Sequence, residues 1–410
     1  MNASRIAVPP RPGETTDQGA AGQNFRPFDI THGGPVYKLE KRIRTIKENE
    51  PLTKRRAVFG ALLTWIPLFV LSLMQGTAFG HSVPVPFLRD FSTYTRFLLA
   101  IPLYLLAENI IGPRVVEAAQ NFVTSRIVLE KDYKRFEEII DSGLRLRDSS
   151  FAEIVLAILA YLFSLVAFRE TALQINSWYV THTETGNSLT FAGWWLVGFC
   201  VPLVQFLVLR WMWRLFLWFQ FLARVCRLDL QLFPTHPDSA GGLGFIGETQ
   251  RFFGILLFAF SLSSMGVLAN DILYGKEPLK SFLPAIATYV VVSLIALVAP
   301  LAVFSGTLFR MKHEGLAEYG ALATAYTGMF HKKWIQDKCR PQEELLGTGD
   351  LQSLADLGNS YAFIQKVKAL PIDPMTLLHL IVASLLPVIP LVLTVMPLKD
   401  LLKLLFKVLM

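Results

Sequence analysis

The sequence has little charge and little cysteine. Charged residues make up 17% of the 410-residue chain and hydrophobic residues 52%, whereas a soluble domain carries about a quarter charged residues. This balance excludes a water-soluble globular enzyme, a secreted module and a disordered or collagen-like chain. The three cysteines, Cys200, Cys226 and Cys339, have no metal or redox spacing. An odd, scattered set of this kind also excludes a disulfide framework.

Sequence motifs of catalysis are missing as well. We find no zinc-ligand spacing, nucleophile elbow, Walker loop or paired-carboxylate motif. The sequence therefore predicts no catalytic residue, no metal site and no cofactor, and an enzyme is not favoured. The N-terminus lacks the charged, apolar and small-residue regions of a cleavable signal peptide, so we expect none.

Seven apolar stretches, each near the roughly 20 residues that a bilayer demands, follow a polar N-terminal region. In lipid the backbone must satisfy its own hydrogen bonds, which makes these stretches helices. We therefore predict an all-α, polytopic membrane protein with about seven transmembrane helices and a helical cytoplasmic layer. The expected spans are 57–80, 94–112, 151–168, 192–209, 252–270, 281–309 and 375–396.

The spans are separated by long hydrophilic segments. We expect transmembrane hairpins at 57–112, 151–209 and 252–309 and a single transmembrane helix at 375–396. The other segments are a disordered N-terminus (1–37), a basic juxtamembrane segment (38–56), an amphipathic helix (113–150), an aromatic, basic and Gly-rich loop (210–251), further helices (310–374) and an amphipathic interfacial tail (397–410). The expected cytoplasmic segments hold about half of the chain, far more than short connections need.

Basic residues predict the orientation of the spans. Of the 39 Lys and Arg residues, all but eight fall on the side that holds the N-terminus. This asymmetry follows the positive-inside rule, so we expect a multi-pass protein of the cytoplasmic (inner) membrane with a cytoplasmic N-terminus. The net charge of +7 then reflects basic residues that face anionic lipid headgroups, and no nucleic-acid partner is needed.

The last span has two interpretations. A full crossing places the C-terminus outside, together with Lys399, Lys403 and Lys407. Pro387 and Pro390 lie in the middle of the span, so a re-entrant hairpin that returns the tail to the cytoplasm is the alternative. We favour the full crossing. On either side, the spacing of the three lysines among leucines predicts an amphipathic helix in the interface.

Apolar residues recur at helical spacing in the segments 113–150 and 310–374. Such stripes are buried against a partner, and the simplest partner is the neighbouring cytoplasmic helix. Docking of a cytoplasmic protein partner is the alternative. A homo-oligomer is a further expectation, because the spans hold few polar residues and oligomerisation would help to form a polar route.

The most distinctive motif is the loop 232–248, LFPTHPDSAGGLGFIGE. Its Gly-x-Gly-x-x-Gly pattern lacks the preceding strand of a dinucleotide-binding fold. The glycines let backbone N–H groups face outward at the N-terminal end of a helix, where the dipole favours an anion. The candidate residues for binding an anion or a lipid headgroup are His236, Asp238, Gly241, Gly242, Gly244 and Gly247. The alternative is a rigid turn in which Asp238 or Ser239 caps the helix.

Part of this loop, HPDSAGGLGF, resembles a His-Pro-Asp-x-Ala-Gly-Gly-Leu-Gly-Phe loop of multi-pass bacterial inner-membrane proteins. The likeness covers residues 235–247 and extends loosely to the layout of the spans. The resemblance implies a bacterial inner-membrane protein and brings no activity with it.

Few ionisable residues lie within the spans, and such residues are expensive in lipid and often functional. Glu108 lies one turn from the cytoplasmic end of the second span, where it lines a pathway or pairs with Arg114. Arg210 and Arg214 follow the fourth span among tryptophans, which is typical of an interfacial belt; a pathway role is the alternative. His379, near the start of the last span, is a further pathway candidate.

Three functions fit these patterns. A channel or transporter of an ion or small solute would place the proline-containing spans around a path lined by Glu108 and His379. A non-catalytic scaffold or sensor would act through the large cytoplasmic half. A lipid-headgroup-binding or lipid-modifying protein would use the loop 232–248. We take the channel or transporter as the first hypothesis.

Overall fold

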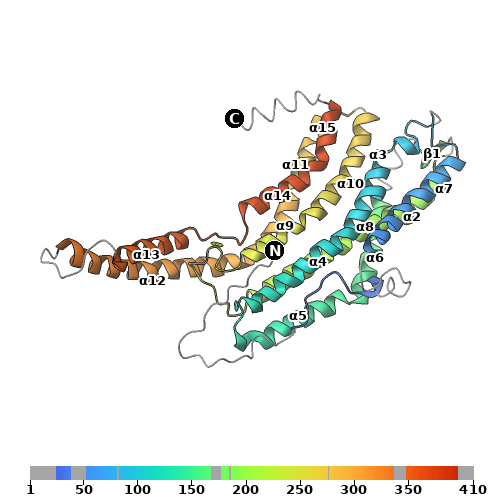
Figure 1. Cartoon of the computed structure of the whole chain (residues 1–410). Helices are drawn as coiled ribbons and strands as arrows, with labels where there is room; N and C mark the ends of the chain where they lie inside the picture. Colours follow the sequence, from blue (N-terminus) through green and yellow to red (C-terminus); the bar gives the residue numbers. More distant parts are fainter. Residues whose placement is uncertain are drawn as a thin grey trace.

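The computed structural model describes residues 25–37, 52–80, 83–167, 177–183, 186–275, 277–336 and 348–395. These residues form a bundle of long helices from which one helical hairpin projects (Figure 1). The strands among them make a single two-stranded antiparallel sheet. The predicted class, an all-α polytopic membrane protein, is confirmed.

Long helices alternate with short connections along the chain. The first half contains α2 (Leu52–Met74), η1 (Phe87–Arg89), α3 (Phe91–Thr93), η2 (Tyr94–Ala100), α4 (Ile101–Thr124), η3 (Glu130–Asp132), α5 (Tyr133–Arg147), α6 (Ser150–Ala167), β1 (Val180–Thr183), β2 (Gly186–Leu189), α7 (Phe191–Trp195) and η5 (Leu196–Cys200). The second half contains α8 (Val201–Val225), α9 (Gly244–Phe252), α10 (Gly254–Leu273), α11 (Leu279–Val298), η6 (Ala299–Phe304), α12 (Ser305–His331), η7 (Lys332–Gln336), α13 (Gly349–Gln365), α14 (Pro374–Leu385), η8 (Leu386–Val388) and α15 (Ile389–Val395). Of the short helices, η2, η5 and η7 are π-helices and the others are 3₁₀ turns.

Six helical stretches of the described residues are long and apolar enough to cross a membrane. A seventh arises when α5 and α6, which meet at a bend of 46°, are counted as one span. The expected number of about seven agrees with the upper count. The outward side chains of α2, including Val58, Phe59, Leu62 and Ile66, are apolar and exposed, as contact with lipid requires.

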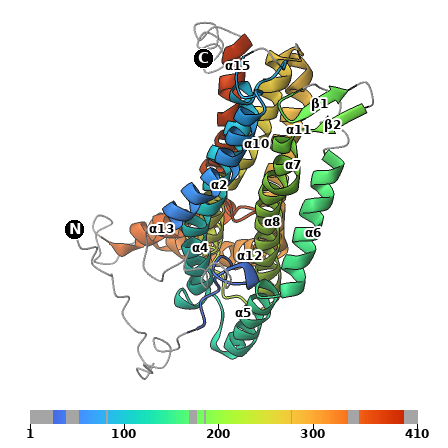
Figure 2. The ribbon, with the colours of Figure 1, turned by 90° about the vertical axis from the view of Figure 1, so that its right-hand side faces the viewer.

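We name the two ends of the bundle by the elements that lie there. The inner end holds the C-terminal ends of α4 and α8, and the outer end holds the β-hairpin and the C-terminal end of α10 (Figures 1 and 2). The long helices α4 and α8 run without interruption into the inner end, where α5 packs against α8. A helical layer continuous with the membrane helices was predicted, and this part of the bundle has that form.

Proline fixes where three long helices change their winding. Pro102 is the second residue of α4, directly after the π-helix η2, and Pro202 is the second residue of α8, directly after η5. Pro300 lies in the 3₁₀ segment η6 between α11 and α12. Proline has no N–H and its ring crowds the carbonyl four residues earlier, so the preceding turn cannot keep regular α-helical hydrogen bonds.

The last span runs through the bundle as one broken helix. α14 leads through the 3₁₀ turn η8 into α15, and the break falls at Pro387 and Pro390. Leu391 of α15 packs in the same small apolar cluster as Leu279, which begins α11 near the outer end. This course agrees with a full crossing and not with a re-entrant hairpin. The tail 397–410 lies outside the described residues.

Residues 25–37, which we call the strap, pack against the inner part of the bundle. Phe28 and Ile30 of the strap are each 1% exposed. The expectation of disorder from residue 1 to residue 37 is therefore wrong for the strap. Its few apolar side chains are buried by helices that lie far along the sequence, which local composition does not reveal.

The projecting hairpin, which we call the arm, consists of α12 and α13 packed against each other (Figure 1). The Tyr326 hydroxyl donates to the Asp350 carbonyl at 3.0 Å, and Trp334 Nε1 donates to the Asp350 carboxylate at 3.0 Å. In this hairpin the helices of the segment 310–374 pack on one another, as predicted. Their apolar stripes are buried only in part, because Leu322 and Leu351 are 55% and 51% exposed.

Candidate functional site

Glu108 of α4 lies at the centre of a buried group of charges. Its Oε1 is 2.8 Å from Arg214 Nη2 and 3.5 Å from Arg210 Nη1. Its Oε2 is 3.2 Å from Arg56 Nη1, and Arg210 Nε is 3.9 Å from Glu153 Oε1. All five side chains are at most 10% exposed. We call these five residues the charge cluster, which joins α2, α4, α6 and α8.

The charge cluster is stabilised at this depth because each of its guanidinium groups lies beside a carboxylate. An ion taken out of water costs several kcal/mol, which opposite charges and hydrogen bonds must offset. Arg214 also lies over the Trp211 ring, with 4.8 Å between its guanidinium carbon and the ring centroid. The expectation that Arg210 and Arg214 form an interfacial belt is therefore wrong, because carboxylates of other helices hold both side chains inside the bundle.

Arg114, the expected partner of Glu108, points elsewhere. Its Nη1 is 2.9 Å from Glu117 Oε2 on the exposed side of α4. Positions 108 and 114 are six residues apart, which places them on different faces of a helix with 3.6 residues per turn. Glu108 pairs instead with arginines of other helices, and the predicted pair with Arg114 is wrong.

The strap binds the charge cluster through its backbone. Arg214 Nη2 donates to the Thr31 carbonyl at 2.9 Å, and Glu153 accepts from the Val36 N–H at 2.7 Å. Guanidinium and carboxylate groups have more donors and acceptors than one ion pair uses. The strap backbone supplies a carbonyl to Arg214 and an N–H group to Glu153, and it thereby covers the charge cluster.

Two glycines allow the strap to pack closely against α4 and α5. Phe28 stacks on Phe221 of α8 with 4.4 Å between ring centroids. Gly143 of α5 makes room for it, since a Cβ at that position would lie 2.6 Å from the Phe28 ring. Gly112 of α4 faces Thr31 in the same way, and a Cβ there would lie 2.3 Å from the Thr31 hydroxyl oxygen. Neither position accepts a side chain while the strap is bound.

Asp29 and His32 form an ion pair within the strap, with 2.8 Å between Asp29 Oδ2 and His32 Nδ1. The hydrogen bond to Asp29 raises the pKa of His32 above its usual value, against the smaller opposing effect of burial. Burial favours the neutral form of Asp29, but the hydrogen bond and charge of His32 and hydrogen bonds from Thr31 outweigh it. The pKa of Asp29 is therefore held below its usual range. Arg147 of α5 anchors the pair by donating to the Asp29 carbonyl at 2.6 Å.

Further polar side chains continue from Glu108 toward the outer end. Tyr104 lies one helical turn away on α4 and is 2% exposed. Ser263 of α10 is its neighbour. Arg96 of the π-helix η2 and Tyr289 of α11 lie within electrostatic reach of Tyr104. We call Arg96, Tyr104, Ser263 and Glu108 the polar column.

The Gly-rich loop uses its N–H groups to bind the chain's own carboxylate. Asp238 accepts from the backbone N–H groups of Ala240 at 2.8 Å, Gly242 at 3.1 Å and Gly244 at 2.8 Å. His236 Nδ1 is 2.8 Å from Asp238 Oδ1. Burial opposes ionisation, but these hydrogen bonds outweigh it and hold the Asp238 pKa below its usual range. Asp238 thus occupies the place expected for a bound anion, and an external anion would have to displace it.

The glycines of this loop have structural reasons. Gly241 and Gly242 have φ of +66° and +101°, values that other residues rarely adopt. Gly247 packs on the segment before α14, where a Cβ would lie 2.3 Å from the Pro371 carbonyl oxygen. The motif therefore forms a rigid turn, in which Asp238 accepts from the N–H of Gly244, the first residue of α9. The N-cap position itself is Leu243, whereas the turn alternative predicted Asp238 or Ser239.

His379 lies away from the polar column. It is exposed on α14, and its Nδ1 is 2.6 Å from the Met375 carbonyl one turn earlier. The structure does not bring this residue to Glu108, so the two pathway candidates are not neighbours.

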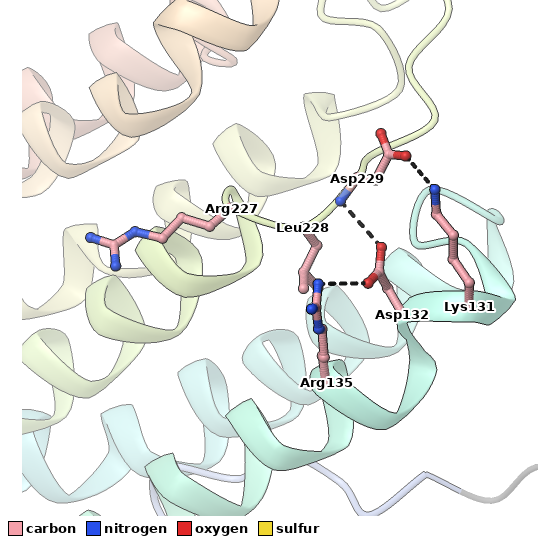
Figure 3. Close-up of a pocket in the computed structure, with 6 residues that line it drawn as sticks. All are labelled: Lys131, Asp132, Arg135, Arg227, Leu228 and Asp229. Carbon is pink, nitrogen blue, oxygen red and sulfur yellow. Dashed lines mark hydrogen bonds and ion pairs between the residues drawn. The ribbon is translucent and has the colours of Figure 1, made fainter.

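A charged pocket of about 640 Å³ lies where the C-terminal end of α8 meets the start of α5 (Figure 3). Lys131 pairs with Asp229 at 2.5 Å, and Arg135 pairs with Asp132 at 3.5 Å. Arg227 points away from these pairs in Figure 3. Lys131, Asp229 and Arg135 are exposed, and exposed ion pairs contribute little to stability. We therefore interpret the pocket as a junction of two connections and not as a binding centre.

No protein-family model, curated protein or solved structure matches this chain. The likeness of the loop 232–248 to bacterial inner-membrane proteins therefore stays a prediction. Sequence reasoning missed Arg56, Tyr104 and the strap as parts of the site. Arg56 was grouped with the juxtamembrane basic residues, and glycines 112 and 143 within helical segments were the available signal for a closely packed segment.

Proposed function

We propose that this protein is a channel or transporter that moves a small ion or solute across the cytoplasmic (inner) membrane. The polar column, which ends at the charge cluster, is the main support, because buried ionisable groups within membrane spans commonly mark ion and substrate paths. The excess of Lys and Arg on the side of the N-terminus supports an N-terminus and an inner end that face the cytoplasm.

In this proposal the strap closes the inner end of the path. Its backbone occupies hydrogen-bonding groups of Arg214 and Glu153, so a solute that arrives from the cytoplasm must first displace it. Release of the strap exposes a guanidinium and a carboxylate together. The strap therefore has the properties of an element with a docked and a released state.

Flux measurements on proteoliposomes test this function. The purified full-length protein is reconstituted, and K⁺ and Cl⁻ fluxes are compared with those of protein-free vesicles. We expect flux through the wild-type protein and about tenfold less through Glu108→Gln, because the amide leaves three guanidinium groups without their shared carboxylate. Glu108→Asp, which keeps the charge, should restore part of the flux.

Glu117→Gln is the matched control for this experiment. Glu117 lies on the same helix, but its side chain is 61% exposed and, within the part of the chain that the structure describes, forms an ion pair only with Arg114 at the surface. We expect unchanged flux in this variant. Equal flux in Glu108→Gln and the wild type would remove Glu108 from the path, and wild-type flux no greater than that of empty vesicles would reject transport.

A scaffold or sensor is the second candidate, because the arm carries exposed apolar side chains. Leu322, Met329 and Leu351 are 55%, 63% and 51% exposed, and no charged residue lies between Glu318 and His331. Apolar surface of this kind is typical of a protein contact. Lipid-headgroup binding at the loop 232–248 has less support, since Asp238 already takes the N–H groups that a headgroup would use.

A further inference from the structure

The arm carries an exposed row of side chains along α12. The members of this row are spaced alternately four and three residues apart, and all of them are exposed: Glu318, Leu322, Ala325, Met329 and Lys332. Side chains with this spacing lie on one face of a helix, as they do along the contact line of a coiled coil. We call these five residues the seam.

The seam lies on the side of α12 that does not face α13. Gly320 faces α13, because a Cβ at that position would lie 3.7 Å from the Tyr361 ring. Tyr326 faces α13 as well, since its hydroxyl donates to the Asp350 carbonyl at 3.0 Å. On the seam side, a Cβ at Gly328 would meet no described atom within 4 Å. The hairpin therefore buries one face of α12 and leaves the seam open to a further helix.

The two ends of the seam carry opposite charges, and its middle is apolar. Glu318 and Lys332 each lie seven residues from Ala325. Between them, Leu322 and Met329 are 55% and 63% exposed. Within the part of the chain that the structure describes, neither Glu318 nor Lys332 forms an ion pair. A helix with the same pattern that runs in the opposite direction matches both the charges and the apolar middle, and a second copy of α12 is such a helix.

We infer that the seam is a homodimer interface, in which α12 of one protomer packs antiparallel on α12 of its partner. A two-fold axis then passes beside Ala325. This packing brings Glu318 of each protomer to Lys332 of the other, and the two apolar middles into contact. A parallel packing would instead place Glu318 beside Glu318, and like charges at such positions repel.

The membrane favours the same arrangement. Two copies inserted in one orientation are related by a two-fold axis along the membrane normal. Such an axis reverses the direction in which each arm points within the membrane plane, so two arms that project toward each other from their bundles meet in opposite directions (Figure 1). The inference does not depend on the proposed function, because dimerisation through the arm requires no transport.

Disulfide crosslinking of the full-length protein in native membranes tests the direction of packing. The background carries Cys200→Ala, Cys226→Ser and Cys339→Ser, and single cysteines are then introduced. We expect Ala325→Cys to give a disulfide-linked dimer on oxidation, because positions beside the axis approach within the roughly 7 Å that a disulfide allows between Cα atoms. Glu318→Cys should give none, since its two copies would lie about 21 Å apart along an antiparallel pair.

Leu351→Cys in the same background is the control for random collisions. Leu351 lies on α13, the other helix of the arm, and is 51% exposed, so its thiol is as accessible to oxidation as one in the seam. We expect little disulfide at this position, and at least about tenfold more dimer from Ala325→Cys, because only the seam holds two copies of one residue together.

Charge reversal in the purified protein tests the pairing of the two ends. Molar mass in detergent is measured by light scattering over a range of protein concentrations. Glu318→Lys should weaken association about tenfold, because it turns both symmetry-related ion pairs of the dimer into like-charge contacts. Lys332→Glu should do the same, and the double variant should restore the wild-type dimer, since opposite charges then face each other again. Asp356→Lys makes the same charge change at an exposed position of α13 and should leave association unchanged.

The outcomes either support the antiparallel dimer or overturn it. Restoration of the dimer by the double variant supports it and also shows that the single variants fail in pairing and not in folding. A wild-type protein that stays monomeric, or Ala325→Cys that crosslinks no more than Leu351→Cys, overturns it. Equal crosslinking at positions 318 and 325 indicates parallel packing and overturns it as well. Flux through a protein that never dimerises would keep the proposed function and reject this interface.

Discussion

Asp238 shows at the scale of one residue how a side chain takes the place of a ligand. Three backbone N–H groups and His236 converge on its carboxylate, an arrangement that elsewhere would bind phosphate or another anion. The positive φ of Gly241 and Gly242 turns these N–H groups inward. The motif that looks most like a binding loop in the sequence is therefore a structural turn, and the carboxylate of Asp238 occupies the position that an external anion would take.

Replacing Asp238 by Asn should destabilise the protein. Hydrogen bonds to a charged group contribute about 1.5–3 kcal/mol each, and the amide offers one oxygen instead of two and brings N–H groups toward other donors. We expect Asp238→Asn to lower the unfolding free energy by about 2 kcal/mol, measured as Tm in detergent. Asp229→Asn is the control, because Asp229 is 66% exposed and its loss should change Tm little.

The pH dependence of the same variant gives a second measurement. The folded pKa of Asp238 is depressed, so its stabilising effect is fully present above the usual Asp pKa of about 3.9. That effect is lost as pH falls through the folded pKa. The difference in Tm between wild type and Asp238→Asn should therefore shrink below about pH 4. A constant difference down to acid pH would contradict the role of the carboxylate.

Individual site residues were predictable to different degrees. Glu108, Arg210 and Arg214 are visible in the sequence because charges stand out among apolar residues. Arg56 and Tyr104 do not stand out, since one lies in a basic segment and the other is an ordinary apolar-span aromatic. Their roles depend on which helices meet, and that depends on tertiary packing that local patterns do not encode.

At the scale of elements, the strap is held by contacts that a single substitution can break. A Cβ at position 112 would lie 2.3 Å from the Thr31 hydroxyl oxygen, so Gly112→Val should expel the strap. We expect faster hydrogen exchange in residues 25–37, by at least about tenfold, and a higher flux through proteoliposomes. Gly306→Val is the control, because no atom lies within 4 Å of a Cβ at that position. Unchanged exchange in Gly112→Val would show that the strap does not need this contact.

Docking of the strap should depend on pH through Asp29 and His32. The raised His32 pKa means that protonation favours the docked strap below about pH 6.5, and this contribution is lost as pH rises through the docked pKa. The depressed Asp29 pKa means that its contribution is present above about pH 3.9 and is lost in stronger acid. Docking should therefore be tightest between about pH 4 and pH 6.5.

Hydrogen exchange of residues 25–37, corrected for intrinsic rates, measures this dependence. The charged groups that face the pair are Arg147 and Asp148 beside the strap, Glu108 of α4 and Arg214 of α8. His32→Ala should remove the change, and His313→Ala, on the arm, should keep it. Protection that increases with pH would contradict this assignment.

At the scale of the whole molecule, the arm projects from the bundle (Figure 1), and only the start of α12, with Leu308 and Met311, belongs to the main hydrophobic core among the described residues. If the scaffold function holds, a photocrosslinker at Leu322 should give a reproducible adduct in native membranes, either with a partner protein or with a second copy of the chain. A crosslinker at Val291 of α11 is the control, because that side chain is similarly exposed, at 53%, but lies within a membrane-crossing helix. Absence of an adduct at Leu322 would count against the scaffold.

The overall architecture was predictable because lipid imposes one strong rule. An apolar run of sufficient length must be a helix, so six or seven spans and their hairpin order follow from hydropathy alone. The strap obeys no such rule. Its burial depends on Phe28 packing against Gly143 and Thr31 packing against Gly112, and a local stretch of sequence does not show which distant glycines meet the strap.

The distance along the chain between the strap and its partners has a consequence for synthesis. Thr31 precedes Arg214, whose guanidinium binds its carbonyl, by 183 residues. A ribosome that adds about 5–20 residues per second needs roughly 10–40 s to cover this separation. The strap therefore waits in the nascent chain while α2, α4 and α6 are inserted, and it docks only after α8 has emerged. Maturation of the protein ends when its inner end is closed by a segment that left the ribosome before any of the described membrane helices.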